Sequence, residues 1–199
     1  MTNPPFSLFK EFLNWIIEAN KKFLIIGNIN AVSYKETFRN IKENKLWLGP
    51  SITSGDREFR VPDDYDLNAS GFRIDEKGNK YIRVKGVRWY SNLEHGKRHQ
   101  PLSLLTIDNN LKYNKKLIKK LEEFGSKTYL KYDNYDAIDV PFTDAIPNDF
   151  EGVMGVPITF LDKYNPDQFE ILELNIKGKI NNKKVYARIM IKHRGKNDN

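Results

Sequence analysis

Cysteine is absent from this chain of 199 residues, and so is any long apolar run. Without cysteine the chain can form no disulfide, no thiolate zinc site and no cysteine nucleophile. No stretch approaches the roughly 20 consecutive apolar residues that a membrane-spanning helix needs. No basic segment followed by an apolar stretch marks a secretory signal at the N-terminus. We therefore expect a cytoplasmic protein with no membrane partner.

Histidine and closely spaced glycines are also scarce. The chain has three histidines, and His95 and His99 lie near each other without a third ligand close in the sequence, so we expect no metal site. No Gly-x-Gly occurs anywhere, although such a turn is what a dinucleotide-type loop uses to approach its cofactor. Gly152 and Gly155 do not replace it, because Pro157 follows and no helical pattern begins there.

Positive charge and aromatic residues are abundant. Lysine and arginine number 33 against 26 acidic residues, which gives a net charge of +7 and a pI of about 9.3. Such a surplus is compatible with a polyanionic partner, because each neutralised phosphate releases counterions. It is equally compatible with a lysine-rich, solvated surface. Hydrophobic residues at 39% and aromatics at 13% supply a core, so a disordered chain is excluded.

The first 45 residues show alternating helical and strand patterns. Apolar residues from Phe9 to Ile17 recur at three- and four-residue spacing, which predicts an amphipathic helix capped by Ser7 and ending near Asn20. The continuous apolar run Phe23–Asn28 predicts a parallel strand that is covered on both faces. A second helix, about Ser33 to Lys45, follows; its predicted inner face holds Tyr34, Thr37, Phe38 and Ile41. This succession predicts a doubly wound α/β arrangement.

Patterns in the remainder are weaker. Residues 47–80 read as a long excursion with a hairpin at Lys77-Gly78-Asn79, and residues 129–147 read as irregular. We predict further elements from alternation or helical spacing: strands at Tyr81–Leu93, Leu102–Ile107, Phe169–Ile176 and Lys184–Ile191, the last with Val185, Ala187, Ile189 and Ile191 inward, and a lysine-rich helix at Asn114–Glu123.

The motif Asn3-Pro4-Pro5-Phe6 carries the clearest chemical signal. Two prolines fix their own φ angles and so hold Asn3 in one orientation. The Asn3 side-chain carbonyl and the Pro4 backbone carbonyl could accept both hydrogens of an exocyclic amino group. That would leave the nitrogen lone pair ready to attack a methyl sulfonium, while Phe6 gives an extruded base a face on which to stack. The simpler alternative is an ordinary turn before a helix.

This motif matches the Asn/Asp/Ser-Pro-Pro-aromatic motif of amino-methyltransferases that use S-adenosylmethionine, and the chain resembles the EcoRI-type adenine-specific DNA methyltransferases. The resemblance runs almost from end to end. Its segments are Asn3–Phe9, Lys22–Asn28, Ile41–Gly49, Glu58–Pro62, Arg88–Leu93, Tyr132–Ile138 and Gly152–Glu170.

The resemblance implies an adenine-specific DNA methyltransferase of a restriction-modification system, acting on double-stranded DNA by base flipping, with Asn3, Pro4, Pro5 and Phe6 as catalytic residues. It implies the second half of a Rossmann-like, S-adenosylmethionine-dependent methyltransferase fold at residues 1–107. A mixed α+β target-recognition region is then expected at residues 108–199. The family's glycine-rich cofactor loop should precede Asn3, so we expect this chain to lack it. The chain would then be a fragment, a truncated gene product, or one half of a split enzyme whose other half is a separate chain.

Further candidates for DNA contact lie outside the motif. The resemblance implies that an aromatic residue near a hairpin, Trp89 or Tyr90, stacks on the flipped base; alternatively both belong to a sheet. Lys97 and Arg98 could bind phosphate in the loop Glu94–Gln100, or lie in a solvated turn. A basic band around the lysine-rich helix gives two further DNA-binding candidates, or a charged solvent-facing surface: Lys112 and Lys116.

Two other functions remain open. The chain could be a DNA-binding remnant, or half of a split enzyme, that is inactive alone. It could also methylate RNA or a protein glutamine, because Asn-Pro-Pro-aromatic motifs serve those reactions too. The extended region after Ile107 favours DNA, because small glutamine methyltransferases do not need it.

Overall fold

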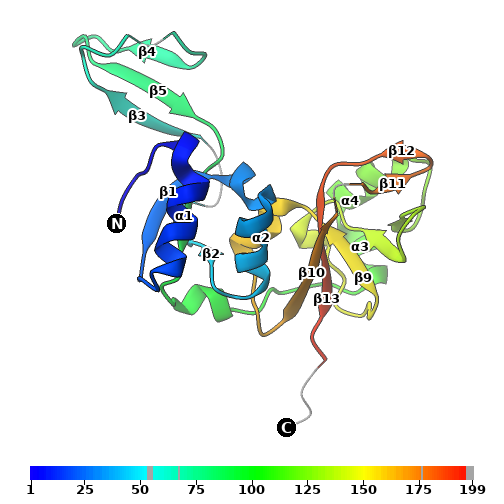
Figure 1. Ribbon diagram of the computed structural model, residues 1–199. Helices are drawn as coiled ribbons and strands as arrows, with labels where there is room; N and C mark the ends of the chain where they lie inside the picture. The colour runs from blue at the N-terminus through cyan, green and yellow to red at the C-terminus, as the bar shows by residue number, and fades with distance from the viewer. Residues whose placement is uncertain (53–55, 67, 176, 196–199) are drawn as a thin grey trace. The chain divides into compact units, whose positions relative to one another are not determined.

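The computed structural model describes residues 1–52, 56–66, 68–175 and 177–195, except for the side chain of Phe6 (Figure 1). The chain divides into two compact units. Unit 1 holds Met1–Thr37 and Leu46–Leu93, and unit 2 holds Phe38–Lys45 and Glu94–Asn199. No helix among the described residues is long and apolar enough to cross a membrane.

A small sheet forms the base of unit 1. Its strands are β1 (Leu24–Asn28), β6 (Val87–Ser91) and β2 (Trp47–Leu48), in the order β1-β6-β2. Both pairings are antiparallel, so β1 and β2 run in the same direction. Thr2 pairs in parallel with Ile25. The Thr2 amide donates a 3.1 Å hydrogen bond to the Leu24 carbonyl, and the Thr2 carbonyl accepts a 3.3 Å hydrogen bond from the Ile26 amide.

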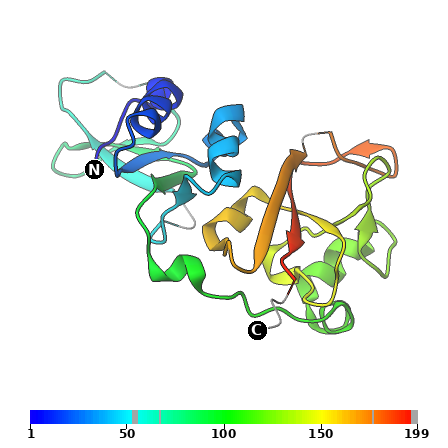
Figure 2. The same cartoon turned by 60° about the horizontal axis from the view of Figure 1, so that its bottom comes forward.

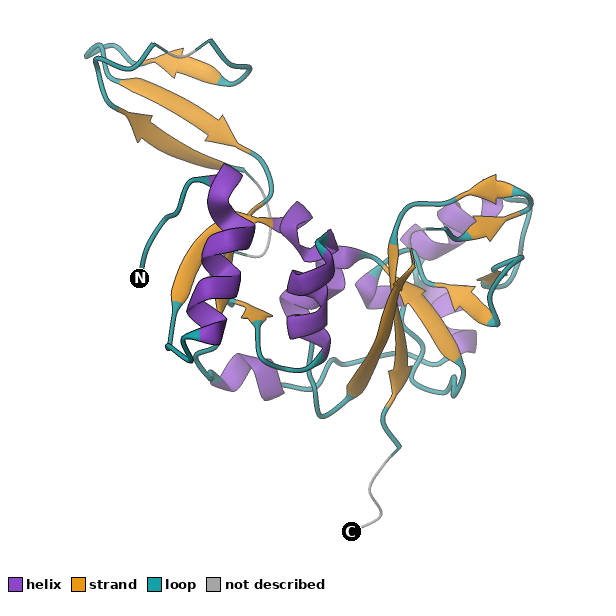
Figure 3. Cartoon of the chain, in the orientation of Figure 1, coloured by secondary structure: helices purple, strands orange, loops and turns teal. Residues whose placement is uncertain are grey.

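Helix α1 (Phe9–Glu18) covers this sheet with the apolar face that its spacing predicts (Figure 3). Phe9 and Leu13 are buried, and the Phe9 ring meets the Tyr90 ring edge-to-face at 4.9 Å between centroids. Gly27 permits this approach, because a Cβ atom at that position would collide with the Phe9 ring. The helix therefore packs close to β1 only where the strand carries no side chain.

Several predictions for the first 45 residues need correction. Helix α1 follows a 3-10 turn, η1 (Phe6–Leu8), and Leu8 rather than Ser7 takes the N-cap position, with no side-chain bond. The stop is confirmed, because Asn20 has a positive φ of 50° after the helix ends. Strand β1 lies antiparallel to β6, and its residues alternate between buried and half-buried. The prediction of a parallel strand covered on both faces was therefore wrong for the pairing with β6 and for the burial.

The second predicted helix is present but shorter. Helix α2 (Lys35–Lys42) follows the 3-10 turn η2 (Ile29–Ser33). Thr37, Phe38 and Ile41 are buried as predicted, whereas Tyr34 is exposed because it precedes the first helical turn.

A second small sheet, in unit 1, comes from the long excursion. It has the order β3-β5-β4 and is antiparallel throughout. The predicted hairpin is confirmed: Gly78 has a φ of 80°, and the Asp75 carboxylate accepts hydrogen bonds from the Lys77 and Asn79 amides. The bounds are β3 (Arg57–Val61), β4 (Phe72–Ile74) and β5 (Lys80–Val84).

Unit 2 is built on a five-stranded sheet of order β10-β13-β9-β8-β7, with α3 and α4 beside it (Figures 1 and 2). Only β8 and β9 are parallel neighbours among its pairs. The core includes Phe160, Phe169 and Ile191, all fully buried. The bounds are α3 (Ile107–Tyr113), α4 (Lys115–Glu122), β7 (Leu130–Lys131), β8 (Ala137–Asp139), β9 (Val153–Val156), β10 (Phe169–Asn175) and β13 (Arg188–His193).

Shorter elements complete unit 2: η3 (Gly96–His99), η4 (Thr143–Ala145), η5 (Ile158–Lys163), and a hairpin of β11 (Lys179–Ile180) and β12 (Lys183–Lys184). The lysine-rich helix is confirmed by α4. The strand predicted at Leu102–Ile107 was wrong. Gln168 holds Leu102 through both backbone groups, in place of a neighbouring strand, and Ile107 begins α3.

Two C-terminal predictions are partly right. Strand β10 matches the predicted Phe169–Ile176 as far as Asn175, and Ile176 lies outside the described residues. The last strand begins at Arg188, later than predicted, and Ile189, Met190 and Ile191 are all buried in it. Residues 129–147 also contain the short strands β7 and β8, although most of them are irregular. The result is a mixed α/β chain with several small sheets.

Candidate active site

The motif begins directly after Thr2, the residue through which the N-terminal segment pairs with β1. Thr2 is fixed to β1 by both of its backbone groups, so Asn3 is the first residue beyond that pairing. Pro4 is buried, whereas Asn3 and Pro5 are exposed. The Pro5 carbonyl accepts a 2.9 Å hydrogen bond from the Leu8 amide and so starts η1. The side chain of Phe6 lies outside the described residues.

The Asn3 side chain is available to a ligand. Among the residues that the structure describes, none forms a hydrogen bond with its amide. An exposed amide that no neighbour holds can donate and accept without first breaking a bond. Because Thr2 and Pro4 fix the backbone on both sides, the place of the Asn3 backbone is set by β1 and by the proline.

Asn28, at the carboxyl end of β1, has a structural role. Its side-chain nitrogen donates to the Lys85 carbonyl at 2.8 Å, and its side-chain oxygen accepts from the Asn30 amide at 3.0 Å. These bonds close the turn into η2 and join it to the loop before β6. The amide of Asn28 is therefore engaged, unlike that of Asn3.

The residues at this edge do not complete a site for S-adenosylmethionine. A nucleoside-type cofactor usually lies on a glycine-rich turn at a helix N-terminus, with an acidic group on its ribose hydroxyls. The turn after β1 has Ile29 and Asn30 in place of glycines, and Asn28 is occupied. Thr2 and Asn3 supply no carboxylate. The described residues at this edge therefore do not fit S-adenosylmethionine.

Trp89 and Tyr90, the predicted stacking residues, lie on opposite faces of β6. Tyr90 is fully buried, and its hydroxyl donates a 2.8 Å hydrogen bond to the Asn28 carbonyl. Its ring packs against Phe9, so it has no face left for a base, and the stacking role does not fit Tyr90. Trp89 is half-buried and stays a candidate.

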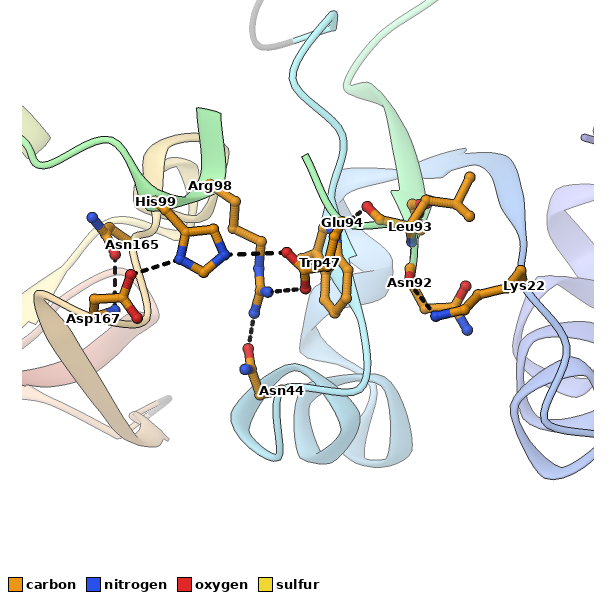
Figure 4. Close-up of polar contacts among 11 residues, drawn as sticks. Lys22, Asn44, Trp47, Asn92, Leu93, Glu94, Arg98, His99, Asn165 and Asp167 are labelled. Carbon is orange, nitrogen blue, oxygen red and sulfur yellow. Dashed lines mark hydrogen bonds and ion pairs between the residues drawn. The ribbon is translucent and has the colours of Figure 1, made fainter. Parts of the chain in front are cut away.

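The loop Glu94–Gln100 is folded around Arg98 rather than around Lys97 (Figure 4). Arg98 as a whole residue is 4% exposed. Its guanidinium pairs with Glu94 at 2.5 Å and donates a hydrogen bond to the side-chain oxygen of Asn44. A phosphate contact would require these bonds to open, so the predicted role does not fit Arg98. Lys97 is exposed, and its contact with phosphate stays a prediction.

His99 joins the same network in unit 2. Its ring nitrogens lie 2.6 Å from an Asp167 oxygen and 3.1 Å from a Glu94 oxygen. The hydrogen bonds to Asp167 and then to Glu94 raise the pKa of His99 above its ordinary value. The described residues include no group of three side chains placed to hold a metal ion.

Lys112 and Lys116 lie on the surface of α3 and α4. The Lys112 ammonium is 5.1 Å from the centre of the Tyr113 ring, and both residues are exposed. Lys116 is 3.6 Å from Asp144, and both side chains are more than half exposed. An ion pair this open is weak, so both lysines can reach a polyanion.

Sequence reasoning missed a basic hairpin. Residues 174–195 contain no acidic residue, and Asn181-Asn182 stands between two lysine-containing segments. A two-residue turn with asparagine between extended segments is a signal for a hairpin. The Asp133 carboxylate holds that turn by accepting hydrogen bonds from the Asn181 and Asn182 amides.

Comparison with known proteins identifies the class. The family model described as adenine-specific methyltransferase EcoRI matches residues 1–199. The chain therefore belongs to the EcoRI family of adenine-specific methyltransferases, as the resemblance implied. No solved structure was found to match it.

Three curated relatives support this. The chain is 47% identical to Type II methyltransferase M.EcoRI of Escherichia coli over 98% of the chain and 57% of that relative. It is 40% identical to Type II methyltransferase M.MgeORF184P of Mycoplasma genitalium and 37% identical to Type II methyltransferase M.MpnI of Mycoplasma pneumoniae, in each case over 87% of the chain and 50% of the relative. The chain spans about half the length of the curated relatives it matches.

Proposed function

We propose that these 199 residues hold the target base and the DNA for an S-adenosylmethionine-dependent methyltransferase that modifies the N-6 amino group of adenine in duplex DNA, within a restriction-modification system. The observation that carries the proposal is the Asn3 amide, exposed and unbonded among the described residues, on a backbone fixed by Thr2 and the buried Pro4. Membership of the family and the Type II methyltransferases among its relatives support it.

The direction of the strands favours a ligand site at this edge. Thr2, β1 and β2 run the same way, with β6 reversed between β1 and β2. Ligands of doubly wound sheets bind beyond the carboxyl ends of the parallel strands. Asn3 follows Thr2 at that end. In this proposal the Thr2 segment, β1 and β2 belong to the second half of a Rossmann-like sheet at residues 1–107. Residues 108–199 would then recognise the target.

The chemistry assigned to the motif is orientation. The Asn3 side-chain oxygen and the Pro4 carbonyl accept the two hydrogens of the adenine amino group and so direct its lone pair toward the methyl donor. Charge that develops on the nitrogen is stabilised by acceptors that are already in place. Phe6 stacks on the extruded base, and Trp89 is the remaining candidate for its other face.

S-adenosylmethionine supplies the methyl group in this proposal, and its glycine-rich loop comes from residues outside these 199. The absence of any Gly-x-Gly supports this assignment. Calorimetric titration of the 199-residue chain with S-adenosylmethionine should therefore give no saturable binding at hundreds of micromolar, a regime of about 5 kcal/mol or weaker. A micromolar isotherm would contradict it.

Activity is best tested in a chimera. The matched part of the Escherichia coli relative is replaced by these 199 residues, and transfer from labelled S-adenosylmethionine is measured on duplex DNA, RNA and protein. We expect label in DNA, as N-6-methyladenine. Label in RNA or in protein glutamine would establish the alternative functions instead. A soluble chimera that binds DNA and transfers no label would identify a DNA-binding remnant.

A further inference from the structure

Strands β11 and β12 form a hairpin (Figure 1). This hairpin and its flanks, residues 177–186, make up the lysine hairpin. Four lysines of this hairpin are exposed, and none of them forms a salt bridge among the described residues: Lys177, Lys179, Lys183 and Lys184. By contrast, Arg188 on the neighbouring β13 is paired with Asp139 at 2.9 Å. The positive charge of the lysine hairpin is therefore left to an external partner.

The tip of the lysine hairpin is a preformed two-residue turn. Asn181 and Asn182 have φ angles of 51° and 62°, the left-handed conformation at both positions that such a turn needs. Lys179 pairs with Lys184, and Ile180 pairs with Lys183. The Asp133 carboxylate accepts from the Asn181 amide at 3.2 Å and from the Asn182 amide at 2.7 Å. Asp133 thus holds the turn without neutralising a lysine by a direct ion pair.

The base of the lysine hairpin is anchored to unit 2. Asn134 accepts from the Lys179 amide and donates to the Lys177 carbonyl, both at 3.0 Å. Ile180 is 2% exposed and packs in a cluster with Tyr132, Ala137 and Met190. Ile180 therefore fixes the ribbon to unit 2, while the four lysines and Tyr186, which is 87% exposed, are open to solvent.

We propose that the lysine hairpin is a DNA-binding element, in which its four lysines contact the phosphate backbone of the duplex and Asp133 holds the turn in the binding conformation. This inference rests on the proposed function, because that function supplies the DNA. A two-stranded ribbon fits a major groove about 12 Å wide. Because the backbone of the turn is already held in one conformation, binding requires no further ordering of the ribbon itself. Tyr186 is placed to enter the groove beside them.

The first test measures salt dependence. Binding of the 199-residue chain to a labelled duplex is followed by fluorescence anisotropy at several salt concentrations. Each phosphate contact contributes about 0.9 to the slope of log K against log salt, so Lys183→Gln with Lys184→Gln should lower the slope by about two. The matched control is Lys21→Gln with Lys163→Gln, two exposed lysines outside the hairpin, which removes the same charge.

The outcomes separate the two proposals. If the wild-type chain shows no salt-dependent binding to duplex DNA, the proposed DNA partner is overturned, and the hairpin's role is overturned with it. If the wild type binds but the hairpin variant keeps the wild-type slope, only the hairpin proposal fails. Equal losses in the hairpin variant and the control would show a general effect of net charge, which also contradicts the proposal.

The second test uses the sign of the effect at Asp133. Asp133→Ala removes a negative charge next to the lysines, so electrostatics alone predicts tighter binding. Loss of the two turn bonds predicts weaker binding, and we expect a several-fold weakening. Circular dichroism and the melting transition check that the rest of unit 2 is folded. A variant with an intact fold that binds DNA as tightly as wild type, or more tightly, would overturn the role of Asp133.

Discussion

The two units carry their basic side chains differently. In unit 1, two arginines of the β3-β5-β4 sheet are paired with nearby carboxylates: Arg73 with Glu58 at 2.5 Å, and Arg83 with Asp56 at 2.9 Å. In unit 2, the lysines of the hairpin have no such partners among the described residues. The neighbouring carboxylates offset part of the positive charge that these arginines present to a polyanion, so unit 2 is the better source of contacts to the DNA backbone. Unit 1 instead offers one exposed amide at Asn3.

This difference indicates a division of tasks. A group that acts on the reacting base should change turnover, whereas lysines that contact phosphates should change affinity and its dependence on salt. Substitutions in the two units should therefore change different measured quantities.

Asn3→Ala in the chimera should lower single-turnover methylation by about 10²- to 10³-fold, because it removes a preorganised acceptor. DNA affinity and its salt slope should change little. Thr2→Ala is the control, since Thr2 acts through its backbone, which alanine preserves. Melting temperatures are measured on the same samples. An Asn3→Ala enzyme that is folded and methylates at the wild-type rate would show that Asn3 is only a turn residue.

Phe6→Ala should weaken capture of the flipped base by roughly 1–3 kcal/mol, the range for base–aromatic stacks. Phe6→Trp should retain most activity, because it keeps a flat aromatic face. The measurement is fluorescence of 2-aminopurine placed at the target adenine, which brightens when the base leaves the stack. Equal signals for the alanine and tryptophan variants would argue against stacking by Phe6.

Tyr90→Phe should lower the free energy of unfolding by about 1 kcal/mol, because the buried hydroxyl bond to Asn28 is lost. Methylation by the folded chimera should stay unchanged, since Tyr90 is a core residue of β6. Denaturant unfolding and turnover are compared for the same protein. A loss of turnover without a loss of stability would restore Tyr90 as a stacking candidate.

The smallest expected effect concerns pH and His99. A hydrogen bond to Asp167, and to a smaller extent one to Glu94, raises the pKa of His99 in the folded state above the ordinary value of 6.5. The protonated form is thus favoured by folding. Its stabilisation is fully present below the unfolded pKa and is lost as pH rises through the folded pKa. His99→Gln should flatten the stability profile between about pH 6 and 8, where a histidine titrates, in unfolding curves measured across that range. An unchanged profile would mean that this contact does not contribute.

Local patterns in the sequence were sufficient for some elements. Helices α1 and α4 follow from apolar spacing, and the turn at Gly78 follows from its neighbours, because short-range chemistry determines these structures. The motif at Asn3 was found in the same way. Its chemical role and the functional regions 1–107 and 108–199 stay predictions.

Contacts between distant residues could not be read from the sequence. The partner of β1 is β6, about sixty residues away, so its antiparallel pairing was missed. Arg98 is a residue type that commonly contacts phosphate, yet it is buried and its guanidinium is bound by Asn44 and Glu94. The lysine hairpin depends on Asp133 in the same way. Each case requires knowledge of which carboxylate or strand the fold brings near.

The central claim is tested most directly by a crossed measurement on the chimera. Single-turnover methylation and the salt slope of DNA binding are determined for Asn3→Ala and for Lys183→Gln with Lys184→Gln. We predict that Asn3→Ala lowers turnover by about 10²-fold or more with an unchanged slope. The lysine variant should lower the slope by about two and keep turnover at saturating DNA. Loss of both properties in both variants, or of neither, would contradict the division of tasks between the motif and the hairpin.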